Sequence, residues 1–201
     1  MFTGIVSDLG EVLEREERAE GLCRLVIACG YDPATIGIGA SIACSGPCLT
    51  VVERGHKGNR AFFAVDVAAE TLRVTTAGSW QRGTRLNLER SLRLGDELGG
   101  HLVSGHIDGI AELLTREDLP DMARLFLRVP APLSRFIAPK GSVALDGVSL
   151  TVNDVAGDTF SVLLIPHTLQ VTTFGSLRAG AHLNVEVDQM ARYAARLLQT
   201  T

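Results

Sequence analysis

The chain has 201 residues, of which 46% are hydrophobic, and a formal net charge of −4. This length allows one large core or two domains of about 100 residues each. The acidic balance and the absence of basic clusters argue against nucleic acid as a partner. No apolar run approaches the length of a membrane span, and the N-terminus does not resemble a secretory signal, so a cytoplasmic location is expected.

An internal repeat organises the sequence. Residues 2–16 align with residues 103–117 at an offset of 101, and residues 43–51 align with residues 144–152 at the same offset. One offset that serves two separated blocks indicates a duplication. Two copies are too few for a solenoid, so each half is expected to close on its own core.

The later part of each copy aligns at a smaller offset. Residues 70–89 match residues 167–186 at an offset of 97, so the first copy holds four extra residues. We place them near residues 53–61 (ERGHKGNRA), where glycine and asparagine mark a turn. The predicted domains are residues 1–96 and 97–188.

Short segments with strand character follow one another in each half. They contain four to eight residues rich in Val, Ile, Leu and Thr, several alternate with period two, and Gly, Asp and Asn separate them. About six strands in each half predict an all-β fold of two similar six-stranded antiparallel Greek-key barrels. The clearest strand segments are residues 22–29, 40–46, 48–53, 61–67, 85–91, 125–129, 142–147, 149–155, 160–165 and 182–187.

Four segments are expected to be helical instead. Residues 70–78 and 167–175 are compatible with a strand or with a helical turn closed by glycine, and we interpret them as helical turns. Two further segments resemble short helical caps across the barrel mouths, each entered by a proline. They are residues 32–39, with Pro33, and residues 131–141, with Pro132.

The C-terminal segment has no counterpart in the first half. Residues 189–199 lack Gly, Pro and β-branched residues and predict an amphipathic helix. Its apolar stripe is formed by Met190, Tyr193, Ala194, Leu197 and Leu198. A single helix of ~11 residues is marginal in water, so it either docks on its own barrel or associates with other subunits; we favour association.

The four cysteines lie in the first quarter of the chain, with spacings that match neither a zinc knuckle nor a redox pair. Cys23, Cys29 and Cys44 are interpreted as small buried hydrophobes. A metal site formed by Cys44, Cys48 and His56 is the minor alternative.

An ordered set of blocks resembles the riboflavin synthase α-chain family. The blocks cover almost the whole chain and occur in the family's order, which makes the set highly specific. They are MFTGIV, GASIACSGPCLTV, GGHLVSGHIDG, DGVSLTV, LIPHTLQVTTFG and LNVEVD before a terminal helix. Ser45 and Pro47 depart from the Asn and Val that are more usual before the cysteine.

The resemblance implies a reaction in which two molecules of 6,7-dimethyl-8-ribityllumazine exchange a four-carbon unit. The products are riboflavin and a ribitylamino-pyrimidinedione. The resemblance implies no metal and no organic cofactor, because the task is to hold two flat rings together and to move protons. It also implies a homotrimer, with the site between the N-terminal barrel of one subunit and the C-terminal barrel of a neighbour. Residues 189–201 would be the trimerisation helix, and association with lumazine synthase is a further expectation.

Opposite roles for two identical substrates require differences between the two copies. We expect Cys48 to relay a proton or to add to the ring as a thiolate, and His106 to transfer protons. The family match adds Asp188 as a partner of His106. It also places Ser149 and Thr151 among the catalytic residues, with hydroxyls that bind the substrate ring or position a water. A structural thiol or a hydrogen-bonded strand end is the alternative for these residues. For His101, a structural hydrogen-bonding role at the domain junction is as well supported as a functional one. The substitutions between the copies are Cys48 for Ser149, Glu70 for His167 and Ile5 for His106.

The same resemblance supplies the walls of the two pockets, which also include Cys48, His106, Ser149 and Thr151. The other expected substrate-binding residues are Gly4, Ile5, Val6, Ser41, Leu49, Thr50, Asp66, Val67, Ala68, Ala69, Glu70, Thr71, Gly105, Ile107, Lys140, Leu150, Leu164, Ile165, Pro166, His167, Thr168 and Leu169.

Two other functions remain as alternatives. A non-catalytic lumazine- or flavin-binding antenna protein on the same fold needs only one good pocket, whereas both copies here keep polar residues. A flavin-dependent oxidoreductase barrel would carry a phosphate loop and a nicotinamide domain, and the sequence contains neither.

Overall fold

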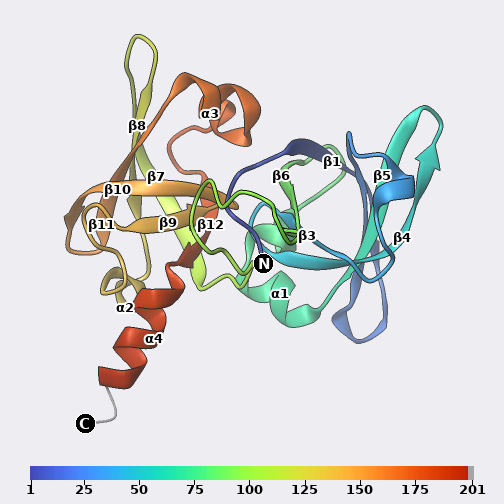
Figure 1. Ribbon diagram of the computed structural model, residues 1–201, viewed down its shortest axis with the longest axis horizontal. Helices are drawn as coiled ribbons and strands as arrows, with labels where there is room; N and C mark the ends of the chain where they lie inside the picture. Colours follow the sequence, from blue (N-terminus) through green and yellow to red (C-terminus); the bar gives the residue numbers. More distant parts are fainter. Residues whose placement is uncertain (199–201) are drawn as a thin grey trace.

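The computed structural model describes residues 1–198 and contains two closed barrels, each of six antiparallel strands, which lie side by side (Figure 1). The strand order β1-β2-β5-β4-β3-β6 closes the first barrel. Its strands are β1 (Asp8–Glu17), β2 (Cys23–Ala28), β3 (Ser41–Cys44), β4 (Cys48–Lys57), β5 (Arg60–Val67) and β6 (Arg85–Arg90).

The second barrel repeats this topology, with β7 to β12 in the places of β1 to β6. Its strands are β7 (Gly109–Asp118), β8 (Ala123–Arg128), β9 (Ser142–Leu145), β10 (Val148–Ala156), β11 (Thr159–Leu164) and β12 (His182–Val187). The prediction of a duplicated six-stranded barrel is therefore confirmed.

Side-chain alternation explains why these segments form barrels. In β2, Cys23, Leu25 and Ile27 point inward and are fully buried, while the residues between them are partly exposed. Each barrel encloses one apolar cluster of this kind. Matching register shifts interrupt β1 and β7 at equivalent places. Such bulges bend a strand sharply enough to follow a small barrel.

The four extra residues of the first copy lengthen one hairpin. The segment 48–67, which contains β4 and β5, is four residues longer than the segment 149–164 in the second barrel. The longer strands project from the first barrel at the right of Figure 1. The insertion therefore lies in a surface hairpin, as the turn residues predicted.

The short helical segments also lie where the sequence predicted them. The two ambiguous segments form helical turns followed by a 3₁₀ turn: α1 (Ala69–Val74) with η3 (Thr76–Ser79), and α3 (Pro166–Val171) with η4 (Thr173–Ser176). The proline-entered caps are η2 (Pro33–Thr35) and α2 (Ala131–Ser134), and a further 3₁₀ turn is η1 (Ala19–Gly21).

The two barrels exchange their leading segments. Phe2 and Val103 form an isolated antiparallel bridge, with hydrogen bonds of 2.8 and 3.1 Å between their backbones. Both side chains are buried in a small cluster with Ala43 and Ala144. All four residues are equivalent pairs of the repeat, so the contact between the barrels has an approximate twofold symmetry.

Two buried asparagines connect the barrels across this symmetry. Asn87 donates from Nδ2 to the carbonyl of Asp146 at 3.0 Å and accepts the N–H of Thr173 at 2.8 Å. Asn184 makes the equivalent bonds to the carbonyl of Ser45 and the N–H of Thr76. Because an unpaired buried amide is costly, these reciprocal bonds fix how one barrel sits on the other.

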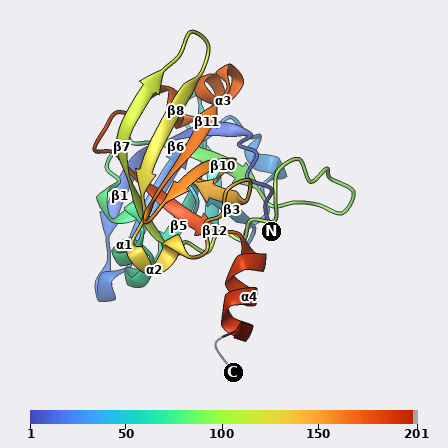
Figure 2. The same cartoon turned by 90° about the vertical axis from the view of Figure 1, so that its left-hand side faces the viewer.

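The terminal helix α4 (Gln189–Leu198) projects away from both barrels (Figures 1 and 2). Arg192 ties its first turns to Asp108 at 2.7 Å, but Met190 and Tyr193 on the stripe are 79% and 64% exposed. Docking of the stripe on its own barrel is therefore not observed. The last three residues of the predicted helical domain, 199–201, lie outside the described residues.

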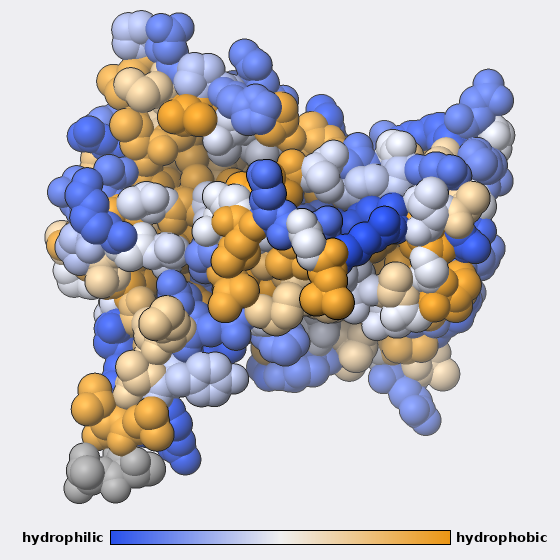
Figure 3. Space-filling model, viewed as in Figure 1, coloured by the Kyte–Doolittle hydropathy of each residue, from blue (hydrophilic) through white to orange (hydrophobic). Residues whose placement is uncertain are grey.

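Apolar side chains also gather around the linker between the barrels, which is the segment between β6 and β7 (Figure 3). The exposed large hydrophobic residues in that region are Met1, Ile5, Leu94, Leu98 and Leu102. Among residues 1–198, no helix has the length and apolarity needed to cross a membrane.

Candidate active site

The backbone of Cys48 is held by the leading segment of the other half. Its N–H donates to the carbonyl of Gly105 at 2.9 Å. Gly105 has a φ of +78°, and a Cβ at this position would lie 2.5 Å from the Cβ of Cys48. Only glycine allows this backbone conformation and this approach. His106 is therefore placed directly after the residue that holds Cys48.

The equivalent contact holds Ser149 in the second barrel. Its N–H donates to the carbonyl of Gly4 at 2.8 Å. Gly4 has a φ of +76°, and a Cβ there would lie 2.5 Å from that of Ser149. In each barrel, the strand that starts near Cys48 or Ser149 thus lies beside a segment of the other half. That glycine segment contains Gly105 beside Cys48 and Gly4 beside Ser149.

A buried glutamate fixes each glycine segment. Glu186 is 1% exposed, and its carboxylate accepts bonds from the N–H and hydroxyl of Ser104 and from the N–H of Gly105, at 2.6–2.8 Å. Glu89 binds Thr3 and Gly4 in the same way at 2.7–2.9 Å. Burial raises the pKa of Glu89, while the bonds from Thr3 and Gly4 lower it.

A histidine contacts the serine of the second site. The Nδ1 atom of His101 and the Oγ atom of Ser149 are 2.7 Å apart. Burial lowers the pKa of His101, and the charges of Asp188 and Glu186 oppose this shift. The Nε2 atom of His101 is buried and has no hydrogen-bond partner within residues 1–198. A largely neutral imidazole can accept the serine proton or donate its own.

Several predicted residues meet in one small cavity beside Cys48. Its volume is about 190 Å³. The lining residues are Pro47, Cys48, Glu70, Thr71, Val74, Thr75, Gly105, His106 and Ile107. The cavity thus combines N-terminal residues with the predicted segment 105–107 from the C-terminal half. It is smaller than typical small-molecule sites of about 300–1,000 Å³.

Other predicted residues have different neighbours within the chain. The Asp66 carboxylate lies 3.7 Å from Arg18 and 4.0 Å from Arg24. Asp188 accepts the N–H of Met190 at 2.9 Å and so caps α4, and no hydrogen bond links it to His106 within residues 1–198. The negative charge of Asp188 instead acts on His101, where it raises the pKa against the larger, opposite effect of burial.

Of the remaining predicted residues, Leu49, Val67 and Leu164 are buried in the apolar clusters of the barrels, whereas several others lie at the barrel surfaces. Glu70 forms an ion pair with Arg73 at 2.6 Å, and this hydrogen bond lowers the pKa of Glu70. Thr151 and Lys140 are exposed, the latter with a φ of +65°. Ser41 accepts the hydroxyl of Ser91 through its carbonyl at 2.8 Å.

Glu89 and Glu186 are functional candidates that the sequence reasoning missed. Both occupy the same place in the repeated strings LNLE and LNVE. An acidic residue retained in both copies at a strand position flanked by apolar residues is unusual, because burial of an unpaired carboxylate is costly. This signal would have identified them.

The cysteines other than Cys48 lie away from the small cavity. Cys23 and Cys44 are fully buried, as predicted, whereas Cys29 is only partly buried. Burial raises the pKa of the Cys44 thiol. Within residues 1–198, no group of three or more His, Cys, Asp or Glu side chains is arranged to hold a metal ion.

The repeated barrels and their exchanged glycine segments define a duplicated ligand-binding β-barrel protein. The chain matches the lumazine binding domain family twice, over residues 3–91 and 104–188. A riboflavin synthase from Brucella abortus (strain 2308) is 58% identical over 200 residues, covering 99% of this chain and 98% of the relative. One from Bacillus subtilis (strain 168) is 36% identical, covering 98% and 90%. The chain belongs to the riboflavin synthase family.

Solved structures show the same fold at lower sequence identity. LumP in complex with riboflavin superimposes with a TM-score of 0.82 at 24% identity, covering 93% of this chain and 99% of LumP. LumP in complex with 6,7-dimethyl-8-(1'-D-ribityl) lumazine gives a TM-score of 0.79 at 23% identity. The family expectation formed from the sequence is confirmed.

Proposed function

We infer that the protein is a riboflavin synthase, which converts two molecules of 6,7-dimethyl-8-ribityllumazine into riboflavin and 5-amino-6-(ribitylamino)uracil by transfer of a four-carbon unit. The 58% identity to a riboflavin synthase over almost the full length of both chains is the observation that carries this conclusion. The paired but chemically unequal barrels supply its physical basis, since one substrate must donate the unit and the other accept it.

The roles of individual residues are our proposal. Cys48 serves the N-terminal site as a proton relay or nucleophile, and His106 transfers protons from the adjacent segment. Ser149 and Thr151 bind the second lumazine, and Asp188 helps to set the charge around the histidines. The shared cavity of Cys48 and His106, and the bond between Ser149 and His101, support this assignment.

We also propose that the active site forms between subunits of a homotrimer. The cavity beside Cys48 is too small for two stacked lumazines with their ribityl chains. The exposed stripe of α4 and the apolar linker region offer surfaces for self-association. One of the two barrels, residues 1–96 and 97–188, then binds the donor and the other the acceptor, and residues 189–201 hold the trimer together.

The reaction itself provides the decisive test. Purified protein incubated with 6,7-dimethyl-8-ribityllumazine alone is expected to produce riboflavin, followed by its absorbance and by chromatography. Tight binding of the lumazine without riboflavin formation would instead identify an antenna protein. Chromatography must also detect the uracil product in equal amount, because the dismutation releases one of each.

Replacement of Cys48 by alanine is expected to lower turnover at least tenfold. The substitution removes the thiol but keeps the backbone bond to Gly105, so the fold and ligand binding should persist. Steady-state kinetics and circular dichroism measure the two effects. Cys29→Ala is the matched control, because this thiol lies outside the cavity. Unchanged turnover in Cys48→Ala would leave the thiol with a packing role.

Removal of residues 189–201 is expected to give monomers with less than a tenth of the activity. Light scattering measures the mass, and the lumazine assay measures the activity. Tyr193→Glu is a milder variant that places a charge on the exposed stripe and leaves the barrels intact. A truncated protein that remains a fully active trimer would contradict the role of α4.

Two further expectations follow from family membership. We propose a cytoplasmic location, and association with lumazine synthase as a second partner interaction. Sedimentation of the two purified proteins together, compared with each alone, tests the association. If the two proteins sediment together, and this cosedimentation is lost when α4 is removed, the contact is made by the assembled trimer.

A further inference from the structure

Each barrel carries a short α-helix followed by a 3₁₀ turn, here called a wall segment: α1 with η3 in the first barrel and α3 with η4 in the second. An arginine connects the first wall segment to β1. Arg15 donates from Nη1 to the carbonyls of Ala77 and Trp80, at 3.1 and 2.9 Å. Its side chain is only 14% exposed, and its Nε and Nη2 atoms lie 2.7 and 2.6 Å from the Glu17 carboxylate. The guanidinium therefore lies between the strand and the turn.

The second barrel repeats this contact. Arg116 of β7 donates from Nη1 to the carbonyl of Phe174 at 2.8 Å, and more weakly to those of Gly175 and Leu177 at 3.4 and 3.3 Å. Its side chain is 12% exposed, and its Nε atom donates to Asp118 at 2.8 Å. The two arginines occupy the same place in the repeated strings LEREE and LTRED, so both copies of the repeat carry this connection.

A bulge precedes each arginine. The register shift in β1 ends at Glu14, one residue before Arg15, and the shift in β7 ends at Thr115, one residue before Arg116. A bulge bends its strand and changes the direction of the side chains beside it. This shared local geometry explains how both guanidinium groups reach a turn that lies about 60 residues further along the chain.

The 3₁₀ turn is fixed to the α-helix that precedes it. A Cβ at Gly78 would lie 2.4 Å from the carbonyl oxygen of Leu72, so only glycine allows η3 to approach α1 this closely. The hydroxyl of Thr75 joins the same two elements, since it donates to the Thr71 carbonyl at 2.6 Å and accepts the N–H of Ala77 at 3.1 Å. A group that holds η3 therefore also holds α1.

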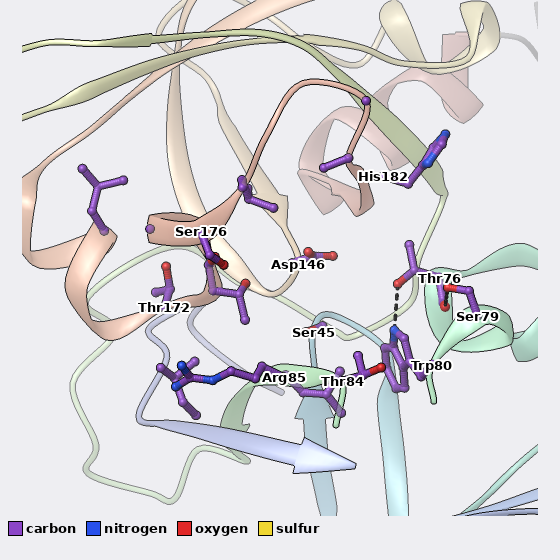
Figure 4. Close-up of a pocket in the computed structure, with 18 of the residues that line it drawn as sticks. Ser45, Thr76, Ser79, Trp80, Thr84, Arg85, Asp146, Thr172, Ser176 and His182 are labelled. Atoms are coloured by element: carbon purple, nitrogen blue, oxygen red, sulfur yellow. Dashed lines mark hydrogen bonds between the residues drawn. The ribbon is translucent and has the colours of Figure 1, made fainter. Parts of the chain in front are cut away.

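Both 3₁₀ turns lie where the two barrels meet (Figure 4). Trp80 is 4% exposed and packs in the core of the first barrel, and its Nε1–H donates to the hydroxyl of Thr76 at 3.2 Å, the bond drawn in Figure 4. In the second copy, a Cβ at Gly175 would lie 2.3 Å from the carbonyl oxygen of Leu169. Each wall segment is thus a compact unit that an arginine fastens to the first strand of its own barrel.

The wall segments carry residues of the expected lumazine sites. Glu70, Thr71 and Val74 of α1 line the cavity beside Cys48, together with Thr75 directly after the helix. The second wall segment includes expected substrate-binding residues as well, namely Pro166, His167, Thr168 and Leu169. Neither Arg15 nor Arg116 lines the cavity beside Cys48. An arginine can therefore act on a site only through the wall segment that it holds.

We propose that Arg15 and Arg116 are positioning residues for the two lumazine sites, an inference that rests on the proposed function. Loss of either guanidinium leaves backbone carbonyls of one wall segment without their donor, and that segment shifts relative to its strand. The binding of one lumazine is then weakened. Cys48 and His106 are carried by other segments, so the effect falls on KM more than on kcat.

Methionine in place of each arginine tests the proposal. Arg15→Met keeps the apolar stem and removes the donors, and it is expected to raise KM for 6,7-dimethyl-8-ribityllumazine about fivefold or more while kcat changes less than about threefold. Arg116→Met is expected to do the same. Arg15→Lys keeps the charge but lacks the planar fork of donors, so it should recover part of the loss. Loss of folding stability alone reduces the amount of active protein and leaves KM unchanged.

Two exposed arginines supply matched controls. Arg60 pairs with Glu11 on the first barrel and Arg128 with Glu112 on the second. Arg60→Met and Arg128→Met are expected to keep the wild-type KM. A wild-type KM in Arg15→Met, or a fall in kcat at unchanged KM, would overturn the proposal. If Arg15→Met does not fold, Arg15→Lys decides, with a KM raised about twofold or more as the expected result.

A direct binding measurement distinguishes this inference from the proposed function. If the wild type forms no riboflavin, the proposed function fails, and the fluorescence of the lumazine then gives its dissociation constant without turnover. Arg15→Met is expected to raise that constant about fivefold or more. An unchanged constant would overturn the positioning role alone, whereas a wild type that does not bind the lumazine would overturn both.

Discussion

Replacement of Glu186 by glutamine is expected to reduce turnover at least a hundredfold. The carboxylate receives three hydrogen bonds from Ser104 and Gly105. A glutamine offers one oxygen and turns an NH₂ toward the remaining donors, which leaves buried groups unpaired. The segment that carries His106 and holds the Cys48 backbone then shifts, and a displacement of about 1 Å is enough to cost about a hundredfold in rate.

Companion variants distinguish a positioning role of Glu186 from a role in folding. Glu89→Gln disturbs the equivalent segment of the other half, so both variants should lose similar stability in urea while their effects on kcat and KM differ. Ser104→Ala removes one of the three bonds and should lower turnover tenfold or less. Glu186→Asp keeps the charge and should recover part of the activity. Wild-type turnover in Glu186→Gln would show that the carboxylate does not position His106.

Replacement of Asp146 by asparagine is expected to stabilise the folded protein at pH 8 by up to about 4 kcal/mol. The pKa of Asp146 is raised from 3.8 to about 7 by burial, and this gap of about 3 pH units at 1.4 kcal/mol per unit sets the upper bound. Asparagine keeps the acceptor for the Asn184 N–H and tolerates the φ of +43°.

The pH dependence has a defined sign. An acid whose pKa is higher in the folded state favours folding when protonated, so its contribution to stability is lost as the pH rises from about 4 to 7. The difference in unfolding free energy between Asp146→Asn and wild type should therefore be small at pH 4 and largest at pH 8. Urea unfolding at both values measures it, with the exposed Asp121→Asn as control. A difference that does not change with pH would contradict the buried titration.

The sequence predicted more of the fold than of the site. The alternation of apolar and polar residues in β2 and the repeat offsets of 101 and 97 were sufficient to predict two barrels. Strand patterning and duplication are both visible in the order of residues alone. The ambiguous segments 70–78 and 167–175 were also assigned correctly, because each forms a helical turn followed by a 3₁₀ turn that contains the glycine. The apolar stripe of α4 was predicted from the sequence. The tertiary structure shows that this stripe does not pack on the barrels of the same chain, which was the alternative to association.

The site depended on contacts between distant residues. Glu89 and Thr3 are 86 positions apart, and nothing local to either residue indicates that they meet. The same holds for His101 and Ser149, whose bond makes His101, left open between a structural and a functional role, a neighbour of the second site. Asp188, expected as a partner of His106, accepts the N–H of Met190 at the start of the terminal helix, a contact that the sequence pattern did not indicate. These differences arise because short polar segments can pair equally well with several strand ends until the barrels are packed together.

The sequence by itself thus determined the duplication, the barrel topology and the family, because each depends on the pattern of residues along the chain. Only the tertiary structure decided that the leading segment of each half crosses to the other barrel, where Gly4 and Gly105 meet Ser149 and Cys48. The physical reason is steric: such a crossing requires two backbones to approach closely enough that a Cβ would lie 2.5 Å from its neighbour. That requirement becomes apparent only when both barrels are folded and in contact.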